Sequence, residues 1–271
     1  LIVNNKIKTY YKNKIAIFTY NLRNNKIKIF SLIILFVLFA IEVYLRWLAL
    51  NSVIINDWVA RDLDKALSLR NGDYIPLTGP DLTNGGRLPG PILYFFLTIP
   101  LLFEKSYEIL FEYNFLLSIA ALVAVFIILK RYFGYYFSAI AVSILALDLY
   151  PISAVHFPTN PSFLFFFLII FVGFFLDFAL NKNEKAVPWL VLILSFGVQF
   201  HYQILTYLLI PILFGLIYKI KISGRTIIIS LVIASNCFLP YGIYKLKMFT
   251  PISNGFNDFS LKNSDQYSIK N

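Results

Sequence analysis

The sequence predicts an all-α polytopic membrane protein with about seven transmembrane helices and a large first extracytoplasmic loop. Of its 271 residues, 59% are hydrophobic and only 14% are charged, whereas about a quarter of the residues of a soluble domain are charged. Apolar runs of about 20 residues, the length that crosses roughly 30 Å of hydrocarbon, recur along the chain. The single cysteine, Cys237, gives no basis for a disulfide framework or a thiol cluster.

A basic leader and seven apolar runs define the predicted topology. Residues 1–28 carry seven of the 24 Lys and Arg residues, and we interpret them as a cytoplasmic leader that orients the chain. The predicted spans are residues 29–50, 107–129, 133–155, 163–180, 187–202, 204–218 and 226–244. The run 92–103 is too short to cross, so we expect it to lie in the interface or to re-enter. The apolar stretch 187–218 is too long for one span, which requires a break near residues 201–206.

The distribution of positive charge gives the orientation. If residues 92–103 do not cross, the leader, Lys130-Arg131 and the loops 181–186 and 220–225 all face the same side and hold 13 of the 24 cations. Positive residues in short loops stay cytoplasmic. We therefore expect a multi-pass protein of the plasma (inner) membrane of a prokaryote, with a cytoplasmic N-terminus, an outer loop at 51–106 and a membrane module at 29–245. Membrane lipids are the expected partners of this surface, and no nucleic acid is expected.

The outer loop is the long polar stretch between two apolar regions. Asp57 precedes apolar residues at helical spacing and Gly72 follows them, which predicts a short amphipathic helix capped by Asp57, with Asp57 alternatively paired with Arg61. Asp62 and Asp64 form a DxD triplet, but residues two apart on a helix point about 200° from each other and cannot grip one ion. A loop of this length is more often functional than idle.

The order of short motifs resembles that of the large GT-C glycosyltransferases, in the protein O-mannosyltransferase and aminoarabinose transferase-like branch (glycosyltransferase family 39-like). The motifs that carry the resemblance are Asp57, Arg61-Asp62, Gly72-Asp73, Leu77-Thr78-Gly79-Pro80, Gly90-Pro91-Ile92-Leu93-Tyr94, Lys130-Arg131-Tyr132-Phe133-Gly134, Thr159-Asn160-Pro161 and Gln199-Phe200-His201-Tyr202. They span residues 28–245. The long C-terminal region of that family is missing, and we expect the extracytoplasmic tail at 246–271 to be its start.

The resemblance implies an inverting transfer of a sugar from a polyprenyl-phosphate donor to a hydroxyl of a glycan, lipid or protein acceptor. Asp57 is the predicted catalytic base. Asp62 is the competing assignment, because Trp58 follows Asp57 where the family often has an acidic or amide residue. The residues expected at the donor phosphate are Arg61, Arg70 and Arg87, since Arg suits bidentate phosphate contact. The candidate substrate-binding residues are Asp148, His156, Asn160, Gln199, His201 and Tyr202.

Cofactor use and two other function classes stay open at this point. No cofactor is certain, although the two histidines with Asp57 could hold a divalent metal ion. Five polar residues on one helical face, Ser195, Gln199, Tyr202, Gln203 and Thr206, would suit sugar hydroxyls, helix contacts or a translocation path. The alternatives to an enzyme are a membrane transporter or lipid flippase, and a non-catalytic truncated membrane subunit. The absence of a convincing internal repeat favours the enzyme.

Overall fold

The computed structural model describes residues 25–51, 55–82, 86–147 and 159–249. These residues are 81% helical and contain no strand. The chain divides into two compact units, residues 1–45 and residues 46–271. Helix α2 (Asn25–Leu50) supplies the described part of the first unit and the beginning of the second.

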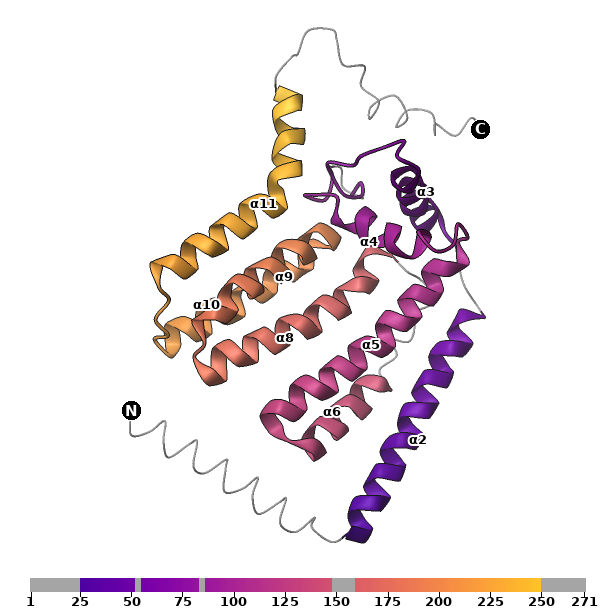
Figure 1. The fold of residues 1–271 in the computed structure, drawn as a ribbon, viewed down its shortest axis with the longest axis vertical. Helices are drawn as coiled ribbons and strands as arrows, with labels where there is room; N and C mark the ends of the chain where they lie inside the picture. Colours follow the sequence, from indigo (N-terminus) through magenta and orange to yellow (C-terminus); the bar gives the residue numbers. More distant parts are fainter. Residues whose placement is uncertain (1–24, 52–54, 83–85, 148–158, 250–271) are drawn as a thin grey trace. The chain divides into compact units, whose positions relative to one another are not determined.

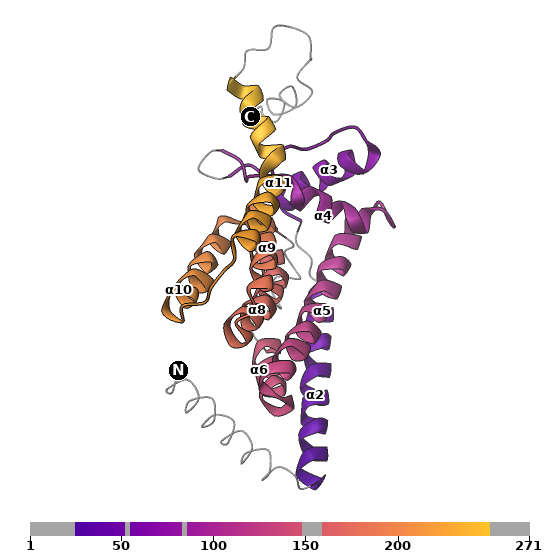
Figure 2. The ribbon, with the colours of Figure 1, turned by 60° about the vertical axis from the view of Figure 1, so that its left-hand side comes forward.

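The second unit contains the remaining helices. In chain order they are α3 (Asp57–Asn71), α4 (Ile92–Leu101), α5 (Glu108–Phe133), α6 (Tyr135–Ala146), η1 (Asn160–Phe163), α8 (Leu164–Asn181), η2 (Glu184–Ala186), α9 (Val187–Phe200), η3 (Tyr202–Leu208), α10 (Leu209–Ile217) and α11 (Gly224–Phe249). Helices α5, α8, α9 and α11 are successive neighbours (Figures 1 and 2). Helix α6 packs on α5, α10 on α8, and α3 on α4.

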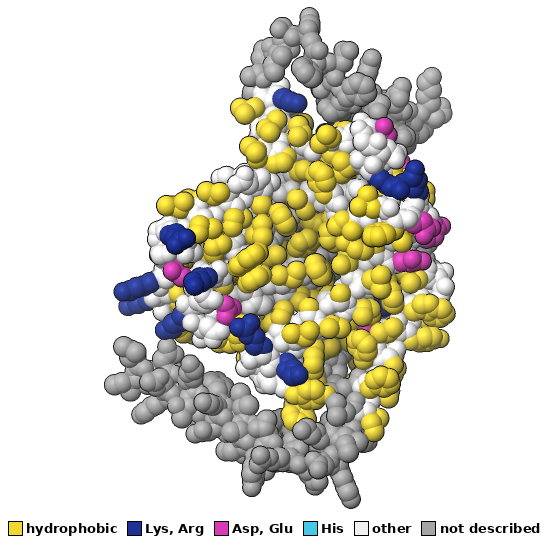
Figure 3. Space-filling view, viewed as in Figure 1, with side chains coloured by type: hydrophobic (Ala, Val, Ile, Leu, Met, Phe, Trp, Pro, Cys, Tyr) yellow, Lys and Arg dark blue, Asp and Glu magenta, His cyan; other side chains and the backbone are white. Residues whose placement is uncertain are grey.

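Three of the described helices are long and apolar enough to cross a membrane. They comprise Glu108–Phe133, Asn160–Asn181 and Gly224–Lys247. This confirms the all-helical membrane class in its coarse form, and the remaining predicted spans stay predictions. Apolar side chains cover the middle of the surface seen in Figure 3, whereas the charged side chains gather toward its ends. Helix α4 has 10 residues, or about 15 Å of helix, in keeping with a segment that does not cross.

The predicted loop helix forms, but its cap differs from the prediction. Gly72 ends α3 in the left-handed region with φ of 80°. The N-cap is Asn56, whose side-chain oxygen accepts a hydrogen bond from the Val59 N–H at 2.9 Å. Asp57 is therefore the first helical residue rather than the cap. Arg61 pairs with the adjacent Asp62, not with Asp57.

The predicted break after α9 lies at His201, whose backbone is extended (φ −162°, ψ 138°). This break corrects the prediction of one continuous polar face, because Ser195 and Gln199 belong to α9 whereas Tyr202 and Thr206 belong to η3. The core near the break is aromatic. Phe96 of α4 lies 5.3 Å, between ring centroids, from Phe200 at the end of α9.

Candidate active site

A cluster of charged side chains forms where α3 meets the loop that follows it. It consists of Arg61, Asp62 and Lys65 from α3 together with Asp81 and Arg87 from the loop, and we call these five residues the outer-loop cluster. The loop folds back on itself through an antiparallel bridge between Asp81 and Arg87. Gly86, with φ of 86°, accepts a backbone hydrogen bond from Leu82 at 2.9 Å at this turn.

Asp62 is the buried carboxylate of the outer-loop cluster. It shares the inner face of α3 with Val59, Leu63 and Ala66, and only 6% of its surface is exposed. Arg61 donates from Nε to Asp62 Oδ1 at 2.8 Å, and its Nη2 lies 2.7 Å from the same oxygen. Both contacts reach Oδ1, so this ion pair is not the two-oxygen fork of a bidentate Arg–carboxylate pair.

Asp81 links the loop to the cations of the outer-loop cluster. Its Oδ1 accepts a hydrogen bond from Arg87 Nε at 2.7 Å, and its Oδ2 lies 3.9 Å from Lys65 Nζ. The Asp81 carbonyl also accepts from Arg61 Nη1 at 3.4 Å. Three cations therefore share two carboxylates, which leaves the outer-loop cluster with one positive charge in excess.

Burial shifts the pKa of two members of the outer-loop cluster. Removal from water raises the pKa of Asp62, and the positive charges of Arg61 and Lys65 only partly offset that shift. Removal from water also lowers the pKa of Lys65. Asp62 is therefore a stronger base than an ordinary exposed aspartate, and Lys65 releases its proton more readily than an exposed lysine.

Aromatic side chains border the outer-loop cluster. The Lys65 ammonium lies 5.6 Å from the ring centroid of Tyr94, and the Arg87 guanidinium lies 5.9 Å from that of Tyr244 on α11. Tyr94 is 1% exposed, and its hydroxyl has no hydrogen-bond partner among the described residues. Burial raises the pKa of this phenol, and the nearby Asp62 carboxylate adds to the shift. A buried hydroxyl without a partner is a candidate ligand group.

Gln199 holds the loop in place from the opposite side. It is fully buried. Its Oε1 accepts from the Ile92 N–H at 3.2 Å, while its Nε2 donates to the carbonyls of Cys237 at 3.0 Å and Ser195 at 3.3 Å. Gly90, with φ of 124°, makes room for it, because a Cβ there would lie 2.1 Å from Gln199 Oε1. Gln199 therefore joins α4, α9 and α11 beside the outer-loop cluster.

The other residues predicted for catalysis and phosphate binding lie at the edge of the outer-loop cluster or outside it. Asp57 is exposed. Asp64 is also exposed and accepts from the Tyr107 hydroxyl at 3.3 Å, while Asp62 is buried, as the helical argument against the DxD triplet predicted. Arg70, in the last turn of α3, has a buried Nη1 with no hydrogen-bond partner among the described residues.

The predicted substrate-binding residues that the structure describes form hydrogen bonds with backbone groups of neighbouring segments. Asn160 donates to the Phe200 carbonyl at 2.8 Å. His201 Nδ1 accepts from the Gln203 N–H at 3.3 Å, so this imidazole caps η3. The Tyr202 hydroxyl donates to the Arg87 carbonyl at 3.4 Å. Asp148 and His156 lie outside the described residues. Within the described ranges no group of three or more His, Cys, Asp or Glu side chains could hold a metal ion.

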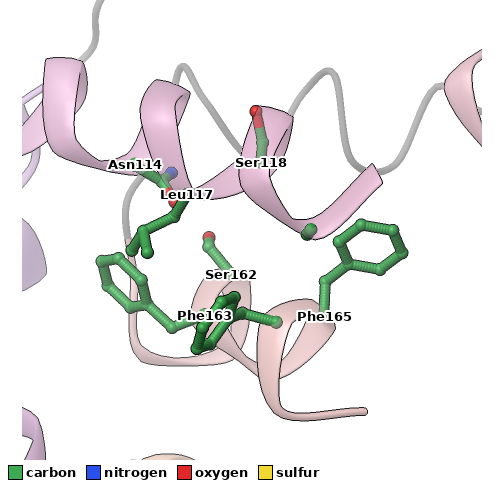
Figure 4. Close-up of a pocket in the computed structure, with 8 residues that line it drawn as sticks. Asn114, Leu117, Ser118, Ser162, Phe163 and Phe165 are labelled. Atoms are coloured by element: carbon green, nitrogen blue, oxygen red, sulfur yellow. The ribbon is translucent and has the colours of Figure 1, made fainter. Parts of the chain in front are cut away.

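A cavity lies elsewhere in the second unit, between α5 and the η1–α8 segment (Figure 4). It has about 320 Å³ of empty space, part of it open to the exterior. Asn114, Leu117 and Ser118 line it from α5, and Ser162, Phe163 and Phe165 line it from the other side. It has no titratable lining residue.

No protein-family model, curated protein or solved structure matches the chain. Its function is therefore argued from the geometry of the outer-loop cluster. Sequence reasoning missed Lys65, Asp81 and Tyr94. The burial of Asp62 could be predicted from the sequence, because Asp62 falls on the apolar face of α3 with Val59 and Ala66. A carboxylate is unexpected on such a face.

Proposed function

We propose that the chain transfers a sugar from a polyprenyl-phosphate donor to an acceptor hydroxyl at the non-cytoplasmic face of the membrane. The observation that carries the proposal is the outer-loop cluster, in which a buried carboxylate of raised pKa lies among three cations. A transfer of this kind requires a base at the acceptor hydroxyl and positive charge at the departing phosphate. Both requirements are present within one cluster beside apolar helices.

Asp62 is the base in this proposal, in place of Asp57. The acceptor oxygen attacks the anomeric carbon and forms the new glycosidic bond while Asp62 takes the hydroxyl proton. The bond between that carbon and the phosphate oxygen breaks, and polyprenyl phosphate leaves with the electron pair. Burial supports this assignment, because it raises the pKa of Asp62 toward that of a useful general base. Asp57 is exposed and has no comparable environment.

The departing phosphate lies against Arg61, Lys65 and Arg87. Lys65 and Arg87 already contact the Asp81 carboxylate, and Arg61 donates to the Asp81 carbonyl, so a bound phosphate would compete with these oxygens for the same donors. Arg61 and Arg87 offer planar donors to phosphate oxygens, whereas Lys65 acts as a point charge. The buried Tyr94 hydroxyl, which has no partner among the described residues, is available to the sugar or the phosphate.

The test compares two aspartates of the same helix. The full chain and its Asp62→Asn and Asp57→Asn variants are reconstituted in vesicles with a panel of polyprenyl-phosphate hexoses and pentoses. Release of polyprenyl phosphate and glycosylation of added acceptors are then measured. We expect Asp62→Asn to lose transfer while Asp57→Asn retains it. Full activity of Asp62→Asn refutes the assignment of the base, and the absence of turnover by the parent chain with every donor refutes the proposed reaction.

A further inference from the structure

A second concentration of charge lies at the opposite end of the helices from the outer-loop cluster. Seven exposed cations are found there: Lys130, Arg131, Lys182, Lys185, Lys219, Lys221 and Arg225. We call these residues the basic end. They occupy the C-terminal turn of α5, the segment between α8 and α9, the segment between α10 and α11, and the first turn of α11. In Figure 3, Lys and Arg side chains gather around the lower left of the surface, below the apolar band.

The two acidic residues near these cations accept hydrogen bonds from other groups, although Arg131 attracts Asp177 and Lys185 attracts Glu184 electrostatically. Asp177 accepts hydrogen bonds from Asn181 at 2.7 Å and Tyr132 at 3.4 Å, and from Asn183. Glu184 accepts from the Ser223 N–H at 2.5 Å, and this backbone hydrogen bond lowers the pKa of Glu184. These bonds join the ends of α5, α8 and α11. The hydrogen bonds of Asp177 and Glu184 therefore connect the segments that carry the cations. Among the described residues, no ion pair includes any of the seven cations.

Two lysines of the basic end have a backbone conformation that favours glycine. Lys182 (φ 53°) and Lys219 (φ 50°) are the non-glycine residues of positive φ in the described ranges. Each stands where its helix ends. The Lys182 N–H points at the Asp177 carbonyl, and after Lys219 the Ile220 N–H bonds the Gly215 carbonyl at 2.9 Å, the pattern of a glycine-terminated helix. Lysine at both positions adds backbone strain, which is a mark of functional residues.

We propose that the basic end binds the headgroups of anionic phospholipids, with Lys182 and Lys219 as its central cations. Charge complementarity favours this occupant, since the cations lie at the border of a broad apolar surface where headgroups meet helix ends. Phosphate oxygens would form the ion pairs that these cations do not form with the described residues. The inference is independent of the proposed transferase function.

Trp189 provides a probe at this end. It is the third residue of α9, four residues after Lys185. It is 52% exposed, and its ring stacks on Phe174 with 5.5 Å between the ring centroids. The other two tryptophans, Trp47 and Trp58, are exposed on α2 and α3. Replacing both with Phe leaves Trp189 as the only source of tryptophan fluorescence. Its quenching by brominated lipids then measures which lipid occupies the adjacent surface.

The experiment uses the full chain carrying Trp47→Phe and Trp58→Phe in phosphatidylcholine vesicles that contain increasing brominated phosphatidylglycerol or brominated phosphatidylcholine. We expect phosphatidylglycerol to quench at lower mole fraction. Each cation near an anionic surface contributes about five-fold to binding, so Lys182→Gly with Lys219→Gly removes a preference of up to about 25-fold. The double variant keeps its unfolding midpoint, because glycine suits both backbone positions.

The matched control is Lys105→Gly, which removes an exposed cation from the loop before α5, at the far end of that helix from Lys130. It is expected to leave the lipid preference unchanged. Equal quenching of the parent chain by the two lipids overturns the proposal. So does a full preference in the Lys182→Gly, Lys219→Gly variant, or an equal loss in Lys105→Gly, which would show an effect of net charge alone.

Discussion

Gly90 offers the sharpest test of how the candidate site is held together. The side chain of Gln199 fills the space that a Cβ at residue 90 would need, with Oε1 2.1 Å and Cδ 2.4 Å from the ideal Cβ position. Gly90 also has φ of 124°, where side chains are disfavoured. Replacing Gly90 with Ala therefore adds two separable penalties, one from the backbone and one from the overlap with Gln199.

The size of each penalty follows from these contacts. A non-glycine residue at such a backbone angle costs about 1–3 kcal/mol. Forcing a methyl group into a filled site costs about 1–3 kcal/mol more. We expect Gly90→Ala to lower the free energy of unfolding by about 2–6 kcal/mol. In a Gln199→Ala background the overlap with the side chain is gone, so only the backbone penalty of about 1–3 kcal/mol remains.

The chain contains its own reporter for this measurement. Cys237 is the only cysteine, it is partly buried on α11, and its carbonyl accepts the hydrogen bond from Gln199. A thiol-reactive fluorophore added during heating in detergent follows the exposure of Cys237 on unfolding. Four chains are compared: the parent, Gly90→Ala, Gln199→Ala and the double variant, which together form a double-mutant cycle.

Gly86→Ala is the control for the backbone penalty, because φ is 86° there and, among the residues that the structure describes, no atom beyond its chain neighbours lies within 4 Å of the added Cβ. It should cost only about 1–2 kcal/mol. A Gly90→Ala penalty that is the same with Gln199 present or removed would refute the packing of Gln199 against the loop. A Gly90→Ala penalty no larger than that of Gly86→Ala would refute it as well.

Three further predictions concern α3 and α4. Asn56→Ala removes the cap of α3 and should cost about 1 kcal/mol, whereas Asp57→Ala should cost less in the same Cys237 assay; the reverse order would contradict the assignment of the cap. The folded-state pKa of Asp62 lies above its unfolded value of about 3.9, so its contribution to stability falls as the pH rises through the interval between them. Asp62→Asn should therefore raise the unfolding midpoint near pH 7 and leave it unchanged near pH 3, and an equal change at both would count against the burial argument. Tyr94→Phe removes a buried hydroxyl that has no hydrogen-bond partner among the described residues. It should leave the free energy of unfolding unchanged or raise it by about 1 kcal/mol, and it should lower sugar transfer. Unchanged transfer would exclude that hydroxyl from the site.

The helices of this chain were largely predictable because apolar content and spacing determine where a helix can form. The loop helix was expected from Asp57 to about Gly72, and α3 spans Asp57–Asn71. The cap was not resolved by the sequence, since Asn56 and Asp57 are both good cap residues. The choice depends on which backbone is extended, and that residue is Asn56, with φ −103° and ψ 174°.

The candidate site was predictable only where its members share one helix. Asp62 and Lys65 lie three residues apart on α3, so their proximity follows from helical geometry. Asp81 reaches them only because the loop turns back, with Gly79 N–H bonded to the Leu88 carbonyl at 3.0 Å. No local pattern encodes the contact between Arg61 and Asp81, which are 20 residues apart. Arg87 and Asp81 are only six residues apart, but their pairing depends on a turn of irregular chain that no periodic pattern predicts.

Gln199 shows why a polar residue in an apolar helix is ambiguous in sequence. Such a side chain can hydrogen-bond to a substrate, and it can equally hydrogen-bond to a backbone group that lacks a partner. In this structure Gln199 binds a backbone group. Pro91 precedes α4 and provides no side-chain cap, so the first N–H of that helix, on Ile92, needs an acceptor in a buried setting. Gln199 Oε1 supplies it at 3.2 Å, and only glycine at residue 90 admits the approach. Gln199 therefore influences the outer-loop cluster by fixing the position of the loop that carries Arg87. Replacing Gln199 should shift Arg87, and any effect on a bound sugar would follow from that shift.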